Sequence, residues 1–445
     1  MFKRVLIANR GEIAIRIIRA CQELGVETVA VYSSADADAV HVKLADQAIN
    51  IGPADATRSY LNMAAILDAA QLAEVDAIHP GYGFLSENAD FAEAVIKAGF
   101  VFVGPRPETI RKVGNKDAAR ELMKQAGLPM ALGSDPVNSL EEAVSTAAKI
   151  GYPIIIKPIA GGGGKSMFVA QNEADIHTAA LKIDFTTAGF YLEKYIANAR
   201  HIEVQIVADN YGDVIHLGER ECSIQRRNQK ILEEAPSCVI TPEMRQKVSA
   251  LAIRAAKSAN YTNIGTVEFL MDKNTCEFYF MEINPRIQVE HAITEITTGV
   301  DLVKTQLRIA SGDPLPIRQE YMKFNCHAIE CRINAEDPDN SFLPSPGEIT
   351  FYHQPGGPNV RVDDGVCTGS IVQPYYDSMI AKIITCGRTR GDAIKTMRRA
   401  LSEFRIVGVK TTIDFHRKLL DNPYFCSGDI DTQFIAKRMT PSSED

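Results

Sequence analysis

The first 114 residues alternate short apolar runs with segments of helical periodicity, and this alternation constrains the fold more than any other feature of the sequence. Residues 4–8 form an apolar run, and Ile13, Ile17 and Cys21 then recur at helical spacing. The same unit repeats through TVAVYSS, VDAIHP and GFVFVGP, with helical segments between the later runs. Such alternation is typical of a doubly wound domain with a parallel sheet, which we expect over residues 1–114.

A dinucleotide-binding dehydrogenase begins in a similar way. The turn after the first predicted strand reads NRGEIA and supplies a single glycine. The dinucleotide fingerprint needs three glycines, for the tight turn, the approach of the pyrophosphate and the packing of the helix. The sequence therefore argues against a dehydrogenase.

The pattern changes beyond residue 115. Two helical segments and the apolar run YPIIIKP precede a run of glycines, and the alternating segments HIEVQIVAD and FYFMEIN follow it. The stretch SGDPLPIRQEYMKF, with two prolines and mixed charge, marks a boundary before a mainly β region. We therefore expect a central domain over residues 115–315 and a C-terminal domain over residues 327–436.

Composition excludes several classes of protein. The net charge is −8, and lysines and arginines are scattered along the chain, so nucleic acid is not an expected partner. No apolar run reaches the roughly 20 residues of a membrane-spanning helix, so we expect no membrane association. The nine cysteines form no Cys-x-x-Cys pair and the N-terminus has no secretory signal. We therefore expect reduced thiols in a cytoplasmic protein.

The glycine run after YPIIIKP indicates phosphate binding. Successive glycines let backbone N–H groups approach phosphate oxygens where a side chain would clash. Glycine runs also occur in surface hairpins, but lysines on both sides of this one favour a phosphate ligand. Isoleucine at position 159 excludes a Walker A loop, which needs a glycine there. The candidate residues are Lys157, Gly161, Gly162, Gly163, Gly164 and Lys165.

Two predicted strands carry polar side chains on one face. In HIEVQIVAD, strand alternation places His201, Glu203 and Gln205 on the same face. Such a face can simply be solvated. In FYFMEINPRIQVEH, however, polar side chains recur at a spacing of two and mix acid, amide and guanidinium groups, which favours a functional site. These side chains are Glu282, Asn284, Arg286, Gln288 and Glu290.

A metal site is predicted on the same strands. Glu268, in GTVEFLMD, lies on the strand expected to pair with the one that carries Glu282. Two carboxylates that face each other across a strand pair repel unless a cation lies between them. With the Asn284 carboxamide nearby, this donor set suits Mg²⁺, which prefers oxygen ligands.

Segments distributed over almost the whole chain resemble biotin carboxylase. They are RVLIANRGEIAIRIIRA, IHPGYGFLSEN, IIKPIAGGGGKSM, YLEKYI, HIEVQ, ERECSIQRR, MEINPRIQVEH, ECRINAEDP, FLPSPG and YYDSMIAKII. The resemblance implies an ATP-grasp fold of mixed α/β and α+β class, with a lid subdomain at about residues 130–197 and a mainly β C-terminal domain. It implies a ligase that forms C–N bonds and uses ATP and bicarbonate to carboxylate biotin.

For the nucleotide, the resemblance implies that Lys116 and Lys157 contact the phosphates and that the glycine loop closes over them. Glu193 and Lys194 would hold the adenine, and His201 and Gln225 the ribose side. Two Mg²⁺ or Mn²⁺ ions would bind at Glu268, Glu282 and Asn284.

For the reaction itself, the resemblance implies that Arg286, Gln288 and the Val289 backbone bind bicarbonate, with Lys230 nearby. A planar guanidinium suits a planar, carboxylate-like anion. Glu290 would be the general base, Arg332 would stabilise the oxyanion of biotin, and Tyr82 would line the biotin side. Without the resemblance, a surface lysine at position 230 and an ordinary ion pair at position 332 would be favoured.

The chain departs from the family pattern at the nucleotide site. Asn228 stands where the family has histidine, Ser166 stands where it usually has glycine, and residues 175–190 form a shorter segment. Asn228 keeps a donor and an acceptor but carries no charge, so a weaker nucleotide contact is expected. A catalytically weakened regulatory subunit therefore remains an alternative. A different ATP-grasp ligase is disfavoured because ECRINAED and FLPSPG are present.

The resemblance also implies partners. The sequence contains no AMKM-type biotin attachment site and no carboxyltransferase region. We therefore expect a biotin carboxyl carrier protein and carboxyltransferase subunits, with acetyl-CoA carboxylase and fatty-acid synthesis through malonyl-CoA as the favoured setting. A pyruvate carboxylase or another acyl-CoA carboxylase remains an alternative. Arg19 and Glu23 resemble a family dimer contact, so a homodimer is expected.

Overall fold

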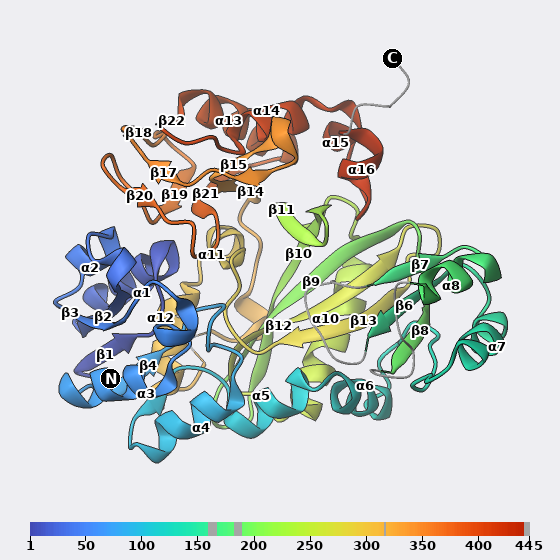
Figure 1. The fold of residues 1–445 in the computed structure, drawn as a ribbon, viewed down its shortest axis with the longest axis horizontal. Coiled ribbons are helices and arrows are strands. Elements are labelled where there is room, and N and C mark those ends of the chain that lie inside the picture. The colour runs from blue at the N-terminus through green and yellow to red at the C-terminus, as the bar shows by residue number, and fades with distance from the viewer. Residues whose placement is uncertain (159–166, 182–188, 316, 440–445) are drawn as a thin grey trace.

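The computed structural model describes residues 1–158, 167–181, 189–315 and 317–439. The glycine loop, Lys165 and Ser166 lie outside these residues. In Figure 1 the N-terminal part of the chain lies at the left, the C-terminal part at the top and the central part at the right. No helix of the described residues combines the length and the apolar character needed to cross a bilayer.

The N-terminal part is built on a parallel five-stranded sheet, as predicted. Successive side chains of its central strand point to opposite faces of the sheet and pack in two separate cores. Val5 packs in the core that contains Ile17, and Leu6 packs in the core that contains Phe91. The strand order is β3 (Gln47–Gly52), β2 (Glu27–Ser33), β1 (Arg4–Ile7), β4 (Ala77–His79) and β5 (Val101–Phe102). The helices are α1 (Gly11–Glu23), α2 (Val40–Leu44), α3 (Met63–Leu72), α4 (Ala89–Lys97) and α5 (Pro107–Gly114).

Strand β3 did not emerge from the hydrophobic pattern. It lies at the edge of the sheet, and most of its side chains are exposed or half-buried. An edge strand with little apolar surface gives a weak periodic signal, because pairing with its neighbour, not burial, holds it.

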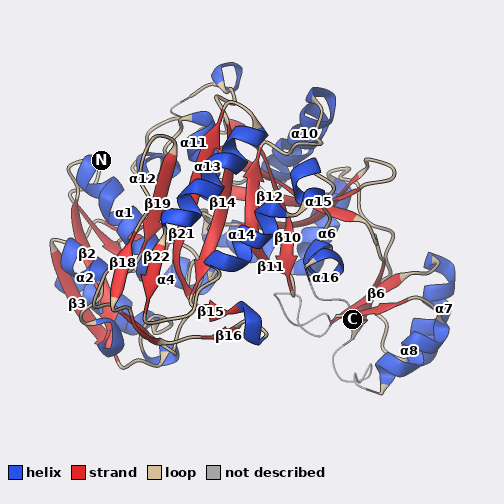
Figure 2. Ribbon diagram, turned by 90° about the horizontal axis from the view of Figure 1, so that it is seen from above, coloured by secondary structure: helices blue, strands red, loops and turns tan. Residues whose placement is uncertain are grey.

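A single antiparallel sheet of eight strands runs through the central and C-terminal parts (Figure 2). Its order is β13 (Phe278–Asn284), β12 (Asn263–Asp272), β9 (Ala199–Ala208), β10 (Val214–Arg226), β11 (Gln229–Ala235), β14 (His327–Asn334), β21 (Met379–Gly387) and β19 (Val360–Asp364). The sequence had indicated a boundary near residue 315. Strand β14 nevertheless pairs with β11 over four residues, so the β-sheet itself is continuous across that boundary.

Helices cover this sheet. Helix α10 (Pro242–Ser258) begins after Thr241, whose side chain accepts a hydrogen bond from the Met244 N–H, and it packs its apolar face on β9 and β12. Further helices of the central and C-terminal parts are α6 (Lys116–Gln125), α11 (His291–Thr298), α12 (Leu302–Ala310), α13 (Arg390–Glu403), α14 (Ile413–Asp421), α15 (Pro423–Ser427) and α16 (Phe434–Arg438). The C-terminal part therefore combines antiparallel strands with a helical layer.

The short C-terminal strands form three two-stranded pairs. They are β15 (Glu336–Asp337) with β16 (Leu343–Pro344), β17 (Gly347–Glu348) with β20 (Ile371–Val372), and β18 (Phe351–His353) with β22 (Arg405–Val407).

A small separate sheet stands at the right of Figure 1. Its order is β7 (Phe168–Ala170), β6 (Ile154–Pro158) and β8 (Phe190–Lys194), and helices α7 (Leu140–Ile150) and α8 (Glu173–Ala180) cover it. These elements bury an apolar core of their own, which includes Ile154, Ile156 and Leu192. We call this unit the small subdomain.

Candidate active site

Three glutamates lie in one row across neighbouring strands of the large sheet. Glu268 on β12 pairs in register with Glu282 on β13, as predicted, and with Glu203 on β9. One oxygen of the Glu268 carboxylate, Oε1, accepts hydrogen bonds from Asn284 Nδ2 at 2.9 Å and from Gln288 Nε2 at 2.7 Å. The sheet register therefore gathers the predicted metal ligands and one predicted bicarbonate residue at a single place.

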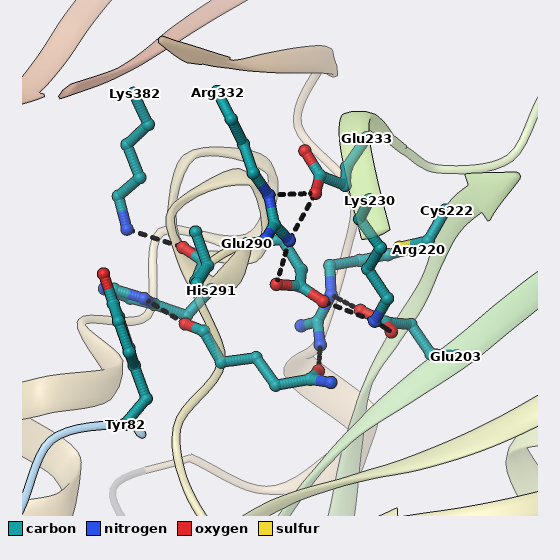
Figure 3. Close-up of polar contacts among 12 residues, drawn as sticks. Tyr82, Glu203, Arg220, Cys222, Lys230, Glu233, Glu290, His291, Arg332 and Lys382 are labelled. Carbon is teal, nitrogen blue, oxygen red and sulfur yellow. Dashed lines mark hydrogen bonds and ion pairs between the residues drawn. The ribbon is translucent and has the colours of Figure 1, made fainter. Parts of the chain in front are cut away.

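The Lys230 ammonium lies among three carboxylates, two of which, Glu203 and Glu290, are shown beside it in Figure 3. Its Nζ lies 2.5 Å from Glu203, 2.9 Å from Glu268 and 2.6 Å from Glu290. Burial by itself lowers the pKa of Lys230, but the three carboxylates outweigh it and raise the pKa well above its ordinary value. Lys230 is 13% exposed and is therefore not a surface lysine.

The same cluster fits a divalent cation. It already surrounds a positive charge with carboxylate oxygens, and oxygen is the ligand that Mg²⁺ selects. The ligand atoms of His201, Glu203 and Glu268 lie within 4.8 Å of one another, and all three side chains are buried. Desolvation and repulsion by the neighbouring Glu268 carboxylate raise the pKa of Glu282, and Lys230 opposes this rise only in part.

The segment after Asn284 differs from the prediction of one extended polar face. Strand β13 ends at Asn284, because the following residue is a proline, which cannot donate a ladder hydrogen bond. The chain then turns, and Glu290 occupies the N-cap position of helix α11 without a capping hydrogen bond from its side chain. Glu290 still points inward, whereas Arg286 pairs with Glu87 at 2.8 Å. We call residues 285–290 the base loop.

Buried donors hold the base loop from behind. Arg220 is fully buried and donates from Nη2 to Gln288 Oε1 at 2.6 Å, which fixes the orientation of that carboxamide. His291 Nδ1 lies 2.7 Å from the Gln288 carbonyl oxygen, and Lys382 Nζ donates to the Val289 carbonyl oxygen at 2.5 Å (Figure 3). The sequence reasoning assigned none of these three donors. All three do lie within family-like segments: Arg220 in ERECSIQRR, His291 in MEINPRIQVEH and Lys382 in YYDSMIAKII.

Glu290 lies between two cations. One of its carboxylate oxygens accepts a hydrogen bond from Lys230 Nζ at 2.6 Å, and the other accepts one from Arg332 Nη2 at 3.0 Å. Burial raises the pKa of Glu290, but Lys230 and Arg332 outweigh it and lower the pKa below its ordinary value. Glu290 is therefore an ionised carboxylate at neutral pH, which is the form that a general base requires.

Arg332 also pairs with Glu233, from Nε to Oε1 at 2.7 Å. Burial raises the pKa of Glu233 to about 7, against the opposing effect of Arg332. The ion-pair partners of Arg332 are thus Glu233 and Glu290, not Glu330 or Glu336. Glu233 was not among the predicted residues.

The predicted adenine and ribose residues lie on two different sheets. His201 Nδ1 on β9 lies 2.9 Å from Gln225 Nε2 on β10, so the predicted ribose pair is in contact. Glu193 and Lys194 belong to the small subdomain. The Lys194 Nζ donates to the carbonyl oxygens of residues 151 and 152, at 3.0 and 2.6 Å.

A cluster of cations surrounds Glu193. Lys157 on β6 and Arg120 on α6 both contact its carboxylate. Burial and the neighbouring charges of Arg120 and Lys116 lower the pKa of Lys157 to about 8. Lys116 is the first residue of α6, one turn before Arg120. The structure thus brings together the two predicted phosphate-binding lysines and adds Arg120, which the sequence did not single out.

Asn228 lies in the two-residue turn between β10 and β11. Arg226 pairs with Gln229, and the two turn residues, Arg227 and Asn228, have φ of +50° and +65°. A hairpin turn with two positive φ values strongly favours asparagine. The departure at this position therefore has a backbone reason.

Tyr82 lies on the other side of the base loop. Its hydroxyl donates a hydrogen bond to Glu12 on α1, and Glu12 faces Lys382 at 3.3 Å. The predicted biotin wall therefore contacts the same buried charges that hold the base loop.

Comparison with known proteins defines the class of this site. Residues 115–318 match the family model described as carbamoyl-phosphate synthase L chain, ATP binding domain, which is an ATP-grasp domain. Residues 1–110 match the biotin carboxylase N-terminal domain, and residues 330–437 match the biotin carboxylase C-terminal domain. The fold and the site are thus those of an ATP-grasp enzyme.

Similar proteins narrow the class to a family. The chain is 56% identical to biotin carboxylase 1 of Bacillus subtilis over 443 residues, with 98% of each chain covered. It is also 49% identical to a pyruvate carboxylase subunit of Methanothermobacter thermautotrophicus, covering 98% of this chain and 90% of that protein.

Two solved structures agree. The biotin carboxylase of Campylobacter jejuni has a TM-score of 0.94 and 46% identity, covering 98% of this chain and 99% of that one. The biotin carboxylase domain of Hydrogenobacter thermophilus 2-oxoglutarate carboxylase has a TM-score of 0.92 and 46% identity, covering 99% and 98%. That structure is a dimer in complex with MgADP, ADP and bicarbonate. The present chain belongs to the biotin carboxylase family and is a ligase.

Proposed function

We propose that the protein carboxylates biotin on a separate biotin carboxyl carrier protein through a carboxyphosphate intermediate, as the first half-reaction of acetyl-CoA carboxylase. The observation that carries this proposal is the contact of Glu290 with both Lys230 and Arg332 beside the Glu268–Glu282 pair. A base, two anion-binding cations and a metal-type donor set then share one site.

The base loop binds and activates bicarbonate in this proposal. The bicarbonate oxygens accept hydrogen bonds from the Arg286 guanidinium, the Gln288 amide and the Val289 N–H, and Lys230 supplies a further positive charge. The Glu290 carboxylate takes the bicarbonate proton. The freed oxygen then attacks the γ-phosphorus, the bond from that phosphorus to the β–γ bridging oxygen breaks, and ADP and carboxyphosphate result.

The nucleotide is held by the cations of the small subdomain and α6. Lys116 and Lys157 contact its phosphates, Glu193 and Lys194 its adenine, and His201 with Gln225 its ribose side; Asn228 contributes from the neighbouring turn. Glu268, Glu282 and Asn284 would hold two divalent cations. When bound, such cations neutralise the phosphate oxygens during transfer.

Arg332 acts on the second substrate. Carboxyphosphate yields CO₂ and phosphate, the phosphate takes the proton from biotin N1′, and N1′ attacks the CO₂ carbon. Negative charge then develops on the ureido oxygen of biotin, where Arg332 stabilises it, because a guanidinium keeps its charge at any physiological pH. Tyr82 lines this side of the site.

Bicarbonate-dependent phosphate release from ATP, measured with and without free biotin, tests the proposal. Wild type should release phosphate only with bicarbonate, and biotin should raise the rate. Glu290→Gln should lower the rate by about 10²–10⁴-fold, the range for loss of a general base. Wild-type protein that binds ATP but releases no phosphate would identify a regulatory subunit instead.

The carboxyl acceptor needs its own test, because relatives serve different acceptors. The Methanothermobacter relative belongs to a pyruvate carboxylase, which favours pyruvate as the second candidate. Reconstitution with the carrier and carboxyltransferase of the same organism should give ¹⁴C-malonyl-CoA from labelled bicarbonate. Label in oxaloacetate would favour the pyruvate carboxylase alternative.

A homodimer is proposed on the basis of Arg19 and Glu23. Both residues are exposed on α1, and Glu23 pairs with Lys304 at 2.5 Å within the chain. Light scattering of wild type and Arg19→Glu tests this contact. Monomers from both proteins would rule it out.

A further inference from the structure

Lys382 is a fully buried lysine that has no role in the sequence-based predictions or in the proposed chemistry. It lies on β21, directly opposite Arg332 on β14. Its exposure is 0%, and the carboxylate of Glu12 on α1 balances its charge. Burying an ammonium is costly unless the charge is paired and hydrogen-bonded, so a methionine would serve packing alone at this position equally well.

The ammonium of Lys382 contacts the backbone of the base loop. Its Nζ donates to the Val289 carbonyl oxygen at 2.5 Å (Figure 3). That carbonyl belongs to the peptide unit that leads into Glu290. Because a peptide unit is planar, fixing its carbonyl also fixes its N–H and the direction in which the next Cα lies. The contact therefore acts on the position from which the Glu290 side chain starts.

A second donor fixes the preceding peptide. His291 Nδ1 lies 2.7 Å from the Gln288 carbonyl oxygen, and burial holds the pKa of His291 well below its ordinary value. The imidazole is therefore neutral and must carry its proton on Nδ1 to donate. The Val289 N–H lies on the opposite edge of that trans peptide from the Gln288 carbonyl. Both peptide planes on either side of Val289 are thus set by buried donors.

Arg332 and Lys382 hold the same short segment from adjacent strands. Their Cα atoms are register partners, so the two side chains leave the sheet side by side on one face. Arg332 reaches the Glu290 carboxylate at 3.0 Å, and Lys382 reaches the main chain one residue earlier. The large sheet therefore fixes both ends of the Glu290 residue relative to each other.

We propose that Lys382 is a positioning residue: it orients the Val289–Glu290 peptide from which the Glu290 side chain starts, while His291 orients the preceding peptide, so that the Val289 N–H and the Glu290 carboxylate meet bicarbonate together. This inference rests on the proposed function of the base loop. The contacts of Lys382 also join the three parts of the chain, because Glu12 belongs to the N-terminal part, Val289 to the central part and Lys382 to the C-terminal part.

The experiment separates positioning from stability. Lys382→Met alone leaves the Glu12 carboxylate buried without its cation, so the double variant Glu12→Gln with Lys382→Met is the informative protein. It removes both charges together and should fold, while the Val289 contact is lost. Glu12→Gln alone is the matched control, because Glu330 and Asp363 remain beside Lys382, so the ammonium keeps neighbouring carboxyl groups and still reaches Val289.

Steady-state phosphate release is measured against bicarbonate and against ATP for each variant, together with the bicarbonate-induced rise in melting temperature. The double variant should raise the bicarbonate KM about tenfold or more, the loss of one hydrogen bond to a charged group, and leave the ATP KM within about twofold. In the double variant the bicarbonate-induced rise in melting temperature should disappear. Glu12→Gln should keep this rise and the wild-type bicarbonate KM.

Lys382→Arg keeps the positive charge and the N–H donors, so its bicarbonate KM should lie within about threefold of the wild-type value. A wild-type bicarbonate KM in the double variant would overturn the inference, as would equal rises in the KM values for bicarbonate and ATP. Failure of the proposed function would be recognised separately, since wild type would then show no bicarbonate-dependent phosphate release.

Discussion

The base loop and the nucleotide cations are built in different ways. Lys230 and Arg332 both stand on strands of the eight-stranded sheet and, with Glu290, are 13% exposed or less. Lys157 and Glu193 stand instead on the small subdomain, which has a sheet and a core of its own.

This difference has a physical consequence. The charges around Glu290 are held by the register of one rigid sheet, so their geometry is set before any substrate arrives. The small subdomain shares no strand pairing with that sheet in the described residues, so a different set of contacts places its cations. Substitutions on the two sides should therefore affect different kinetic and thermodynamic quantities.

The largest expected effect is on the base side, at Lys230. Lys230→Met leaves three buried carboxylates without their ammonium, and we expect a loss of about 3–5 kcal/mol in the free energy of unfolding. Added Mg²⁺ should recover part of this loss, because it replaces the missing charge. Urea unfolding with and without Mg²⁺ measures both effects. The matched control is Lys247→Met, which breaks an exposed pair with Glu277 and should cost about 1 kcal/mol or less. Equal losses in the two variants would contradict the comparison.

Glu234 tests the continuity of the large sheet. It lies on β11 and binds His327 on β14 and Arg390 at the start of α13. Burial raises its pKa, but hydrogen bonds from His327 and Arg390 outweigh it and lower the pKa from 4.5 to about 2. The folded pKa lies below the unfolded one, so the stabilisation is complete above about pH 4.5 and disappears as the pH falls toward 2.

Glu234→Gln should therefore cost on the order of 3 kcal/mol at pH 7 and progressively less in acid. Urea unfolding of both proteins between pH 7 and pH 3 measures the difference. A difference that stays constant over this range would show that the charge of Glu234 contributes nothing.

On the nucleotide side, Lys157→Met should raise the ATP KM by about 10–100-fold, the effect of removing one hydrogen bond between charged groups. The bicarbonate KM should stay within about twofold, because Lys157 contacts Glu193 and not the base loop. Lys149→Met, an exposed position on α7, is the control and should change neither value. A parallel rise in both KM values would show that the two sides are coupled.

The smallest expected effect is at Asn228. Asn228→His should lower the ATP KM by about threefold or less, because a ring donor is regained while the turn must still hold a positive φ. Titration calorimetry with ADP gives the same comparison without turnover. Weaker ADP binding in the variant would show that the turn, and not the side chain, sets this contact.

Much of this architecture could be predicted from the pattern of residues. The parallel N-terminal sheet and its helix α1 followed from apolar periodicity, and the pairing of Glu268 with Glu282 followed from strand alternation. These features are local, or depend on two segments that a short connection joins, so the sequence contains their signal. Edge strand β3 was missed because it buries little apolar surface.

Features that depend on distant segments could not be predicted in this way. The polar run after Glu282 has the spacing of a strand, yet it becomes a turn after Asn284, where a proline follows. The sequence placed a boundary before β14, but that strand extends the central sheet by pairing with β11. Pairing between segments so far apart in the chain leaves no periodic trace in either of them.

The sequence by itself determined the polar types along β9, β12 and the base loop, and through its family-like segments the class of enzyme. Only the tertiary structure decided that Lys230 lies among three carboxylates, that Arg220 orients Gln288 and that Lys382 reaches the Val289 carbonyl. Each of these side chains looks like an ordinary charged residue in the sequence. Its role comes from burial, because a charge removed from water must find its partners wherever the fold provides them.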